Sequence, residues 1–372
     1  MALRKARAAV GAASEIEAAA DEVLGKGNAV DAVVAGVFAA CAVSPGVLLG
    51  PVQLLVGGAG AGLLAIDGRV RQPGLGAPRP RGFLSAEEIP DAARVGVPWL
   101  PAAMSAAIAT MGTATFNQVL SPAVALAKNT PRHDVLARIA ARGPRALEEH
   151  TLAGELLAAA GRPAGGLLTP EDLASPQPQV QKASRLELVT PAVASRAPVS
   201  GTRQGARSLS AELARRKSAA EAEPRVLVTF PWTRLEADLP APPAHDVDVA
   251  RVRAVAAVDR NATFAIACWD EATDGVSIPE LGLRAPFFAE PVRRGQTRVR
   301  PGDVRAAAGP VAFVGGAAGP ELALAAFGAS DAYGVLAQAI ESIVTEERIE
   351  AHGDARLVAL AHVNGTASVL RS

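Results

Sequence analysis

Apolar side chains recur at helical spacing through much of the first half of the chain. The segment Ser14-Glu-Ile-Glu has the form of a capping box, and it predicts a helix that ends at Gly25 or Gly27. Residues 28–41 are apolar on nearly every face, which predicts a second, buried helix. Pro, Gly and Thr breaks separate the further predicted helices, at residues 98–111, 117–128, 133–141 and 151–160.

Short apolar runs bounded by glycine predict the strands of a buried sheet. Two of them cover residues 52–56 and 62–66, and Asp67-Gly68 after the second is typical of a hairpin turn. Later runs predict strands at residues 186–189, 226–230, 253–259, 263–269, 311–314 and 357–363, with a helix near 332–345. Strands, then helices, then strands again favour a layered α/β sandwich.

Composition narrows the class of protein. A hydrophobic fraction of 49% in 372 residues is enough to bury a sizeable core, and we expect one compact body. Lys plus Arg and Asp plus Glu are both 37, so the formal net charge is +0. No global field then attracts nucleic acid or an anionic membrane, and small molecules or proteins are the expected partners. Near-zero charge also favours association with itself or with a permanent partner.

The sequence has no pattern typical of a disulfide framework or a metal site. Cys41 and Cys268 both lie inside apolar runs, where a thiol behaves as a small hydrophobe. The five histidines have no metal-ligand spacing, and the glycine-rich runs 57–62 and 315–319 are predicted to be turns between strands. We therefore expect neither metal nor cofactor. With no signal-peptide pattern and no membrane segment, the cytoplasm is the expected location.

Several motifs resemble the γ-glutamyltranspeptidase family. In the first half they are the Lys-Gly-Asn-Ala-Val-Asp-Ala turn at residues 26–32, Val97-Pro98, the helix 120–127 and the Gly-Gly-Leu-Leu-Thr-Pro-Glu-Asp-Leu segment 165–173. In the second half they are Gly275-Val-Ser-Ile-Pro, Arg300-Pro-Gly and Gly309-Pro-Val-Ala-Phe-Val. The resemblance covers roughly residues 8–175 and 250–345. It implies the four-layer αββα sandwich of N-terminal-nucleophile hydrolases and a link to glutathione metabolism.

The same resemblance divides the chain into parts of a single domain over residues 1–372. Residues 8–175 correspond to the family's large subunit and residues 246–372 to its small subunit. The connection between them, residues 176–245, is irregular in pattern and much shorter than in family members.

The nucleophile of that family is missing from this sequence. Family members cleave themselves before a threonine, whose hydroxyl then attacks the substrate. Counting back from Val258-Asp259 places Val252, Arg253 and Ala254 where the family has its Thr-Thr-His-like triplet. A shift of register does not help, because residues 245–262 contain no Ser, Thr or Cys.

Other parts of the family's site are missing as well. Gly74 stands where an arginine would clamp the substrate carboxylate, so its charge-assisted bonds are lost. The oxyanion loop is reduced to Ser200 and Gly201, and the Ser-Ser-Met-like loop reads Ala-Ala-Ala at residues 306–308. By position alone, Ser200, Gly201 and Arg253 are the substrate-binding residues that the resemblance implies; it implies no catalytic residue.

Fold motifs without site motifs predict a pseudoenzyme: an unprocessed scaffold, regulatory or binding subunit, in a homo-oligomer or beside an active paralogue. One alternative is an enzyme whose cleft is equipped for another reaction by Arg253, Ser200, Thr202 and Arg305. The other alternative keeps γ-glutamyl transfer or hydrolysis through an unrecognised nucleophile, Thr229 or Thr263.

Overall fold

A computed structural model supplies the fold. It describes residues 7–58, 62–78, 82–174, 176–188, 225–231, 251–305, 311–316, 319–327, 336, 339, 356–363 and 366–371.

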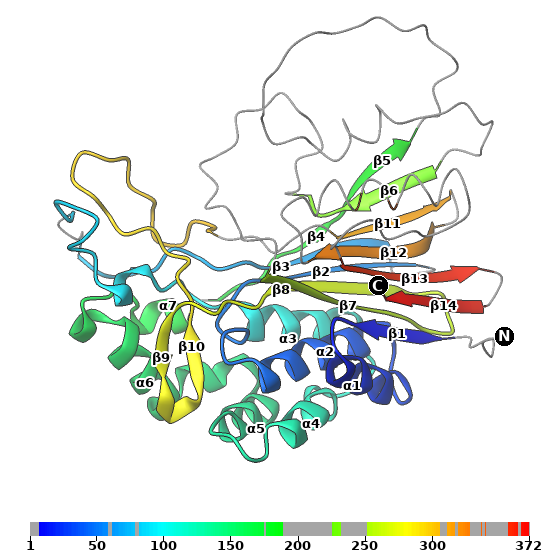
Figure 1. The fold of residues 1–372 in the computed structure, drawn as a ribbon, viewed down its shortest axis with the longest axis horizontal. Helices are drawn as coiled ribbons and strands as arrows, with labels where there is room; N and C mark the ends of the chain where they lie inside the picture. The colour runs from blue at the N-terminus through cyan, green and yellow to red at the C-terminus, as the bar shows by residue number, and fades with distance from the viewer. Residues whose placement is uncertain are drawn as a thin grey trace, which may run out of the picture.

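Two six-stranded sheets face each other, and a layer of helices covers the outer face of the first (Figure 1). The first sheet has the order β1 (Ala8–Gly11), β7 (Val252–Val258), β8 (Phe264–Asp270), β2 (Val52–Gly58), β3 (Gly62–Gly68), β4 (Val180–Lys182). The second has the order β14 (Thr366–Arg371), β13 (Arg356–Val363), β12 (Gly319–Phe327), β11 (Val311–Gly316), β6 (Arg225–Thr229), β5 (Ser184–Leu188). All strand pairs within the two sheets are antiparallel.

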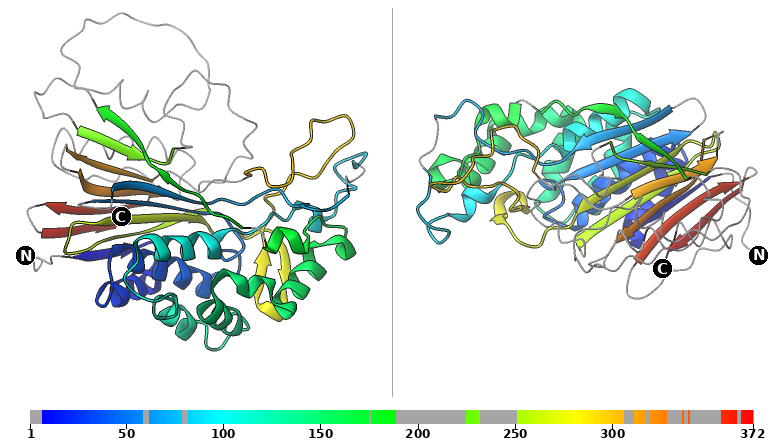
Figure 2. Two further views of the ribbon diagram at one scale, coloured as in Figure 1. Left: turned by 180° about the vertical axis from the view of Figure 1, so that it is seen from behind. Right: turned by 90° about the horizontal axis from the view of Figure 1, so that it is seen from above.

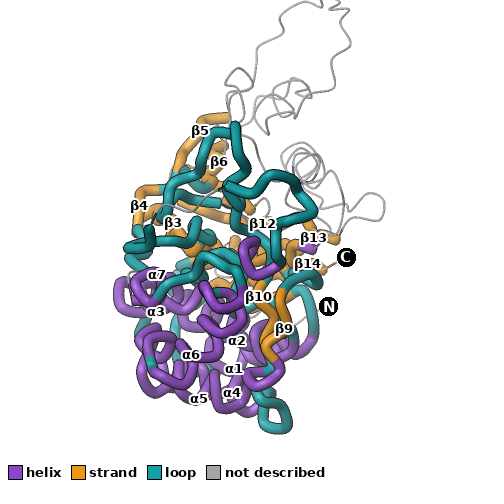
Figure 3. Tube along the Cα trace, turned by 90° about the vertical axis from the view of Figure 1, so that its left-hand side faces the viewer, coloured by secondary structure: helices purple, strands orange, loops and turns teal. Residues whose placement is uncertain are grey.

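The helices gather below the first sheet, as Figures 2 and 3 show from other sides. They are α1 (Ser14–Leu24), α2 (Ala29–Val43), α3 (Leu100–Met111), α4 (Phe116–Leu126), α5 (Arg132–Arg142), α6 (His150–Ala160) and α7 (Pro170–Ala174). A small hairpin, β9 (Val276–Ile278) and β10 (Leu283–Ala285), packs beside α6. The short 3₁₀ turns are Asp91–Arg94, Gly143–Glu148, Arg162–Ala164 and Pro279–Leu281.

Each predicted helix of the first half is confirmed, but one cap is wrong. Helix α2 begins with the capping box that Asn28 and Asp31 form, and 14 of its 15 residues are buried. Helix α1 lacks such a box: Ser14 Oγ donates to Glu15 instead, and the Glu17 carboxylate accepts from the Gly11 backbone N–H. The cap residue is Ala13, so the local hydrogen bonds of Ser14 go to its exposed neighbour.

Of the predicted strands all are found, and the turn at Asp67-Gly68 is wrong. Strand β3 continues through Asp67 and Gly68, which pair with Gln53 and Val52 of β2. At the other end of β3, Gly62 pairs with Gly58 of β2. A buried carboxylate can end this strand because two arginines neutralise it, as described below.

Two apolar cores divide the molecule into layers. The residues of β7 alternate between them: Val252, Ala254, Ala256 and Val258 lie between the sheets, and Val255 and Ala257 lie against the helices. The described residues thus give a helix–sheet–sheet sandwich. Of the helix predicted near residues 332–345, Leu336 and Ala339 are helical and buried, and the rest lies outside the described residues.

Both predicted halves contribute to the first sheet, in which β7 and β8 lie between β1 and β2. Residues 180–188 then pass from β4 of the first sheet to β5 of the second, so one segment joins the two sheets. The division of the single domain at residues 175 and 246 stays a prediction. No helix in the described part of the chain is long and apolar enough to cross a membrane.

Candidate functional site

The resemblance predicts the nucleophile at the edge of the first sheet where β7 begins. Val252 opens this strand, is 1% exposed and pairs with Asp270 at the end of β8. Two residues further along the strand, Ala254 pairs with Cys268. Val252 and Ala254 both face the space between the sheets. Two aliphatic side chains, neither of which could attack a carbonyl, therefore lie at the position where the resemblance predicts the nucleophile.

Arg253 points to the opposite side of the sheet. Successive residues of a strand alternate in direction, and Val255, two positions on, belongs to the core against the helices. The Arg253 Nε lies 3.1 Å from the Glu271 carboxylate. This predicted substrate-binding residue therefore follows Val252 in sequence but lies on the helical face of the sheet, away from the inter-sheet core.

Arg251 holds the chain immediately before β7. Its carbonyl accepts a hydrogen bond of 3.0 Å from the Glu271 backbone N–H, which extends the β7–β8 ladder past Val252. Its guanidinium lies 3.4 Å from the buried Asp270 carboxylate and 3.1 Å from that of Asp274. Arg251, the residue before Val252, is therefore held in two ways. Its carbonyl bonds to the Glu271 backbone, and its side chain pairs with Asp270 and Asp274.

A group of buried charges lies on the same edge and the same face of the sheet. Register aligns Ala254, Cys268, Gln53 and Asp67 across four neighbouring strands. The Asp67 carboxylate accepts bonds of 2.9 Å from Arg69 Nε and 2.9 Å from Arg69 Nη2, and one of 2.7 Å from Arg71 Nη2. We call Asp67, Arg69 and Arg71 the edge triad.

Electrostatics favour the ionised form of the edge triad. Burial alone would raise the pKa of Asp67, but the hydrogen bonds and charge of Arg69 and the charge of Arg71 outweigh it and hold that pKa below its ordinary value. Burial lowers the pKa of Arg71, and Asp67 opposes that shift. Arg71 also stacks on Trp99, with its guanidinium carbon 3.9 Å from the ring centroid. The arginine nearest the family's clamp is thus engaged by an acid and a ring.

Gly74, which the resemblance places at the clamp position, has a backbone conformation that disfavours an arginine. Its φ of +115° is one that residues with a side chain rarely adopt. The buried Asp172 accepts bonds from the backbone N–H groups of Gly74 at 2.8 Å, Leu75 at 3.1 Å and Thr169 at 3.0 Å. Burial raises the pKa of Asp172 despite these bonds. The loop after the edge triad is therefore fixed to α7 in a shape that requires glycine.

The remaining predicted residues separate in space or lie outside the described part. Ser200, Gly201, Thr202 and the alanines 306–308 are outside the described residues, so their predicted roles stay predictions. Arg305 is at the edge: its backbone N–H donates to the Val70 carbonyl. Its guanidinium lies 2.7 Å from the Glu290 carboxylate.

Neither alternative threonine lies at this edge and face. Thr263 precedes β8, at the far end from the Val252–Asp270 row, about 20 Å away at roughly 3.3 Å per residue. Thr229 alternates on β6 with Val228 and Phe230, which belong to the inter-sheet core, so it faces away from that core. Burial raises the pKa of the Cys268 thiol, which keeps it protonated.

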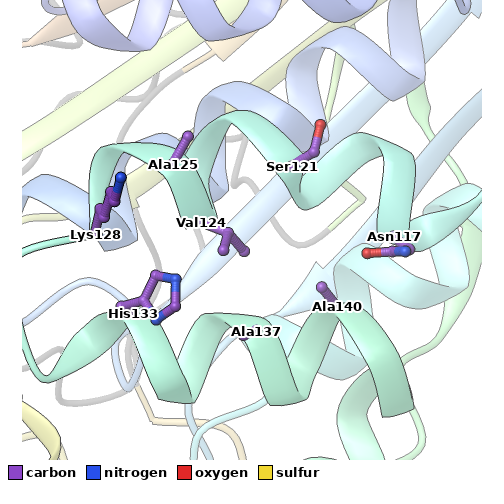
Figure 4. Close-up of a pocket in the computed structure, with 8 residues that line it drawn as sticks. All are labelled: Asn117, Ser121, Val124, Ala125, Lys128, His133, Ala137 and Ala140. Carbon is purple, nitrogen blue, oxygen red and sulfur yellow. The ribbon is translucent and has the colours of Figure 1, made fainter.

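A cavity of about 330 Å³ lies elsewhere, between α4 and α5 (Figure 4). Its lining residues are Asn117, Ser121, Val124, Ala125, Lys128, His133, Ala137 and Ala140. His133 Nδ1 is 3.0 Å from the carboxylate of the exposed Asp134. Within the described ranges no group of three or more His, Cys, Asp or Glu side chains could hold a metal ion.

The described residues form two facing antiparallel sheets, the first of which is covered by helices, and solved structures share this fold. No protein-family model and no curated protein matches the sequence. Among solved structures, the cephalosporin acylase from Bacillus halodurans matches with a TM-score of 0.67 and 12% identity, over 99% of this chain and 96% of that one. The structure of LmbA2991HD matches with a TM-score of 0.66 and 15% identity, over 99% and 97%.

A γ-glutamyltranspeptidase from Helicobacter pylori is 22% identical over 50% of this chain and 68% of that one, with a TM-score of 0.43. A score this low carries no structural argument. The two matches over nearly the whole chain show the fold alone, and in that respect they confirm the predicted resemblance.

Proposed function

We propose that this chain is a catalytically silent, unprocessed protein with the fold of an N-terminal-nucleophile hydrolase, acting as a scaffold, regulatory or binding subunit. The observation that carries the proposal is the start of β7. There Val252 is buried between the sheets, and Arg251 before it continues the ladder to β8. An N-terminal nucleophile needs a hydroxyl or thiol and a free amine at this position. Valine supplies no such side chain.

The residues at the expected substrate clamp support the same proposal. A γ-glutamyl donor needs a cation for its carboxylate, and Gly74 at the clamp position has none. Arg71 is nearby, yet its charge is shared with Asp67 at 2.7 Å. A ligand carboxylate would have to compete with a buried partner that is already bound, which costs the energy of breaking a buried pair.

Incubation of the purified protein with a γ-glutamyl anilide tests the proposal. We expect no release of the aniline above buffer. The matched control is Val252→Ala, which removes the two γ-methyl groups at the predicted nucleophile position without adding a reactive group. Turnover in the wild-type protein that disappears in Val252→Ala would contradict the proposal.

The second candidate is an enzyme whose cleft serves another reaction. The concentration of buried charge at one edge, in Asp67, Arg71 and Asp270, favours it, since ionisable groups cluster at reactive sites. Hydrolysis of a panel of amide, ester and β-lactam substrates would support it if Asp67→Asn abolished turnover while the protein stayed folded. Absence of turnover across the panel leaves the silent subunit as the function.

A further inference from the structure

An arginine-rich loop leaves the sheet at the same edge, beyond the edge triad. From residue 291 to residue 302 the sequence reads Pro-Val-Arg-Arg-Gly-Gln-Thr-Arg-Val-Arg-Pro-Gly, with four arginines and no acid. We call Arg293, Arg294, Arg298 and Arg300 the arginine loop. Three of the four, all except Arg298, are exposed. In a protein of formal net charge +0, this is a local excess of positive charge.

None of these arginines forms an ion pair with any residue that the structure describes, whereas Arg305 just after them pairs with Glu290 at 2.7 Å. Arg294 Nε donates only to the Gly82 carbonyl, at 3.2 Å. The Nε of Arg298 is buried and has no hydrogen-bond partner among the described residues. Guanidinium groups bind carboxylates through two parallel hydrogen bonds, and here those donors are available.

The backbone of the loop is held in place at both ends. At its start, the Phe83 N–H donates to the Val292 carbonyl and the Arg294 N–H to the Phe83 carbonyl, both at 2.9 Å. At its end, the Gly302 N–H donates to the Gln72 carbonyl at 2.8 Å. A loop fixed in this way loses little conformational entropy when it binds a partner. Figure 1 shows it projecting with the segment around residue 84, away from the sheets.

An apolar side chain stands beside these charges. Leu84 follows Phe83, which bridges to Arg293, and Leu84 is 65% exposed, the highest value among the exposed large hydrophobic residues described. Such a side chain gains by contacting apolar surface on a partner. Glu87 and Glu88, also exposed, lie three and four residues after Leu84, and the Glu88 carboxylate accepts a hydrogen bond of 2.9 Å from the Leu84 backbone N–H.

We propose that the arginine loop and Leu84 form a docking surface for an acidic peptide segment of a partner protein, one that carries an apolar residue next to its carboxylates. Charge complementarity selects carboxylates, and Leu84 selects a peptide over a bare anion. Nucleic acid fits less well, since a duplex needs a broad basic face and the positive charge here is confined to one loop. The surface is separate from the start of β7 and does not depend on whether the protein is silent.

Fluorescence anisotropy with a labelled peptide of alternating glutamate and leucine tests the proposal. The variant is Arg293→Gln, Arg294→Gln, Arg298→Gln and Arg300→Gln together. The matched control removes four exposed cations elsewhere, by Lys128→Gln, Arg145→Gln, Arg162→Gln and Arg260→Gln. We expect affinity to fall about tenfold or more in the first and to stay within about twofold in the second, because each exposed pair contributes modestly. We also expect weaker binding at higher salt.

A second arm separates the partner classes. A peptide of alternating glutamate and serine should bind several-fold more weakly than the leucine peptide, and Leu84→Ser should remove that difference. Equal loss of affinity in the loop variant and its control would overturn the proposal. So would an oligonucleotide of equal charge that displaces the peptide at a lower concentration than the unlabelled peptide does.

Discussion

Replacement of Asp67 by asparagine isolates the charge pairing at the edge where β7 begins. The Asp67 side chain is 3% exposed and Arg71 is 6% exposed, so neither group can exchange its partner for water. In the wild-type protein, guanidinium groups donate to both carboxylate oxygens of Asp67. Asparagine keeps one of these oxygens and replaces the other by an N–H₂ group, which cannot accept those bonds. Removing one partner of a buried ion pair costs about 3–5 kcal/mol, and we expect Asp67→Asn to lower the free energy of unfolding by about 3 kcal/mol or more.

Urea unfolding followed by tryptophan fluorescence measures this loss, with Trp99 stacked on Arg71 as a local reporter. The matched control is Asp91→Asn, whose carboxylate is 72% exposed and 3.9 Å from Arg94 and should contribute under about 1 kcal/mol. Adding Arg71→Met to Asp67→Asn should recover part of the loss, since no uncompensated cation remains at that position. An Asp67→Asn protein within about 1 kcal/mol of the wild type would refute the assignment of a buried, charged triad.

The pH dependence of the same variant has a defined sign. Because the pKa of Asp67 is lower in the folded protein than its ordinary value of 3.8, its stabilisation is fully present above that value. It is lost as pH falls through the lowered pKa. The difference in unfolding free energy between wild type and Asp67→Asn should therefore be constant near neutral pH and shrink in acid below about pH 4.

Three further predictions concern other parts of the molecule. The thiols of Cys41 and Cys268 should not react with a disulfide reagent in the native protein and should react after unfolding, because burial raises the pKa of both; rapid native reaction would contradict this. Asp172→Ala should lower the free energy of unfolding by about 1–3 kcal/mol by leaving backbone N–H groups without an acceptor, with the exposed Glu171→Ala as a neutral control in the same urea titration. Val252→Thr should still migrate as one chain, since the carbonyl before it stays bonded to β8; fragments on a denaturing gel would count against that.

Much of the fold was predictable because its elements carry strong local patterns. The apolar helix that became α2 and the strands that became β2, β7 and β8 follow from periodicity and turn residues. Asp67-Gly68 misled for a physical reason: the pair is typical of a turn, but tertiary pairing of the carboxylate with two arginines lets β3 continue through it. A local sequence motif does not reveal hydrogen bonds that form only in the folded state.

The site was less predictable, because the face of a strand changes with each residue. Arg253 is next to the predicted nucleophile position in sequence and therefore on the other side of the sheet. The edge triad was missed, although Asp67, Arg69 and Arg71 recur at a spacing of two, the period that places strand residues on one face. This alternation of charged and uncharged residues after an apolar strand was the sequence signal that could have predicted the triad. Arg251 gave none, because its partners Asp270, Glu271 and Asp274 lie about twenty residues further along the chain.

Intact-mass spectrometry of the freshly purified protein tests the central claim most directly, because processing precedes catalysis in an enzyme with an N-terminal nucleophile. The account predicts one species with the mass of the uncut 372-residue chain, unchanged on prolonged incubation. Two fragments whose masses place a cut at the peptide bond before Val252 would contradict it.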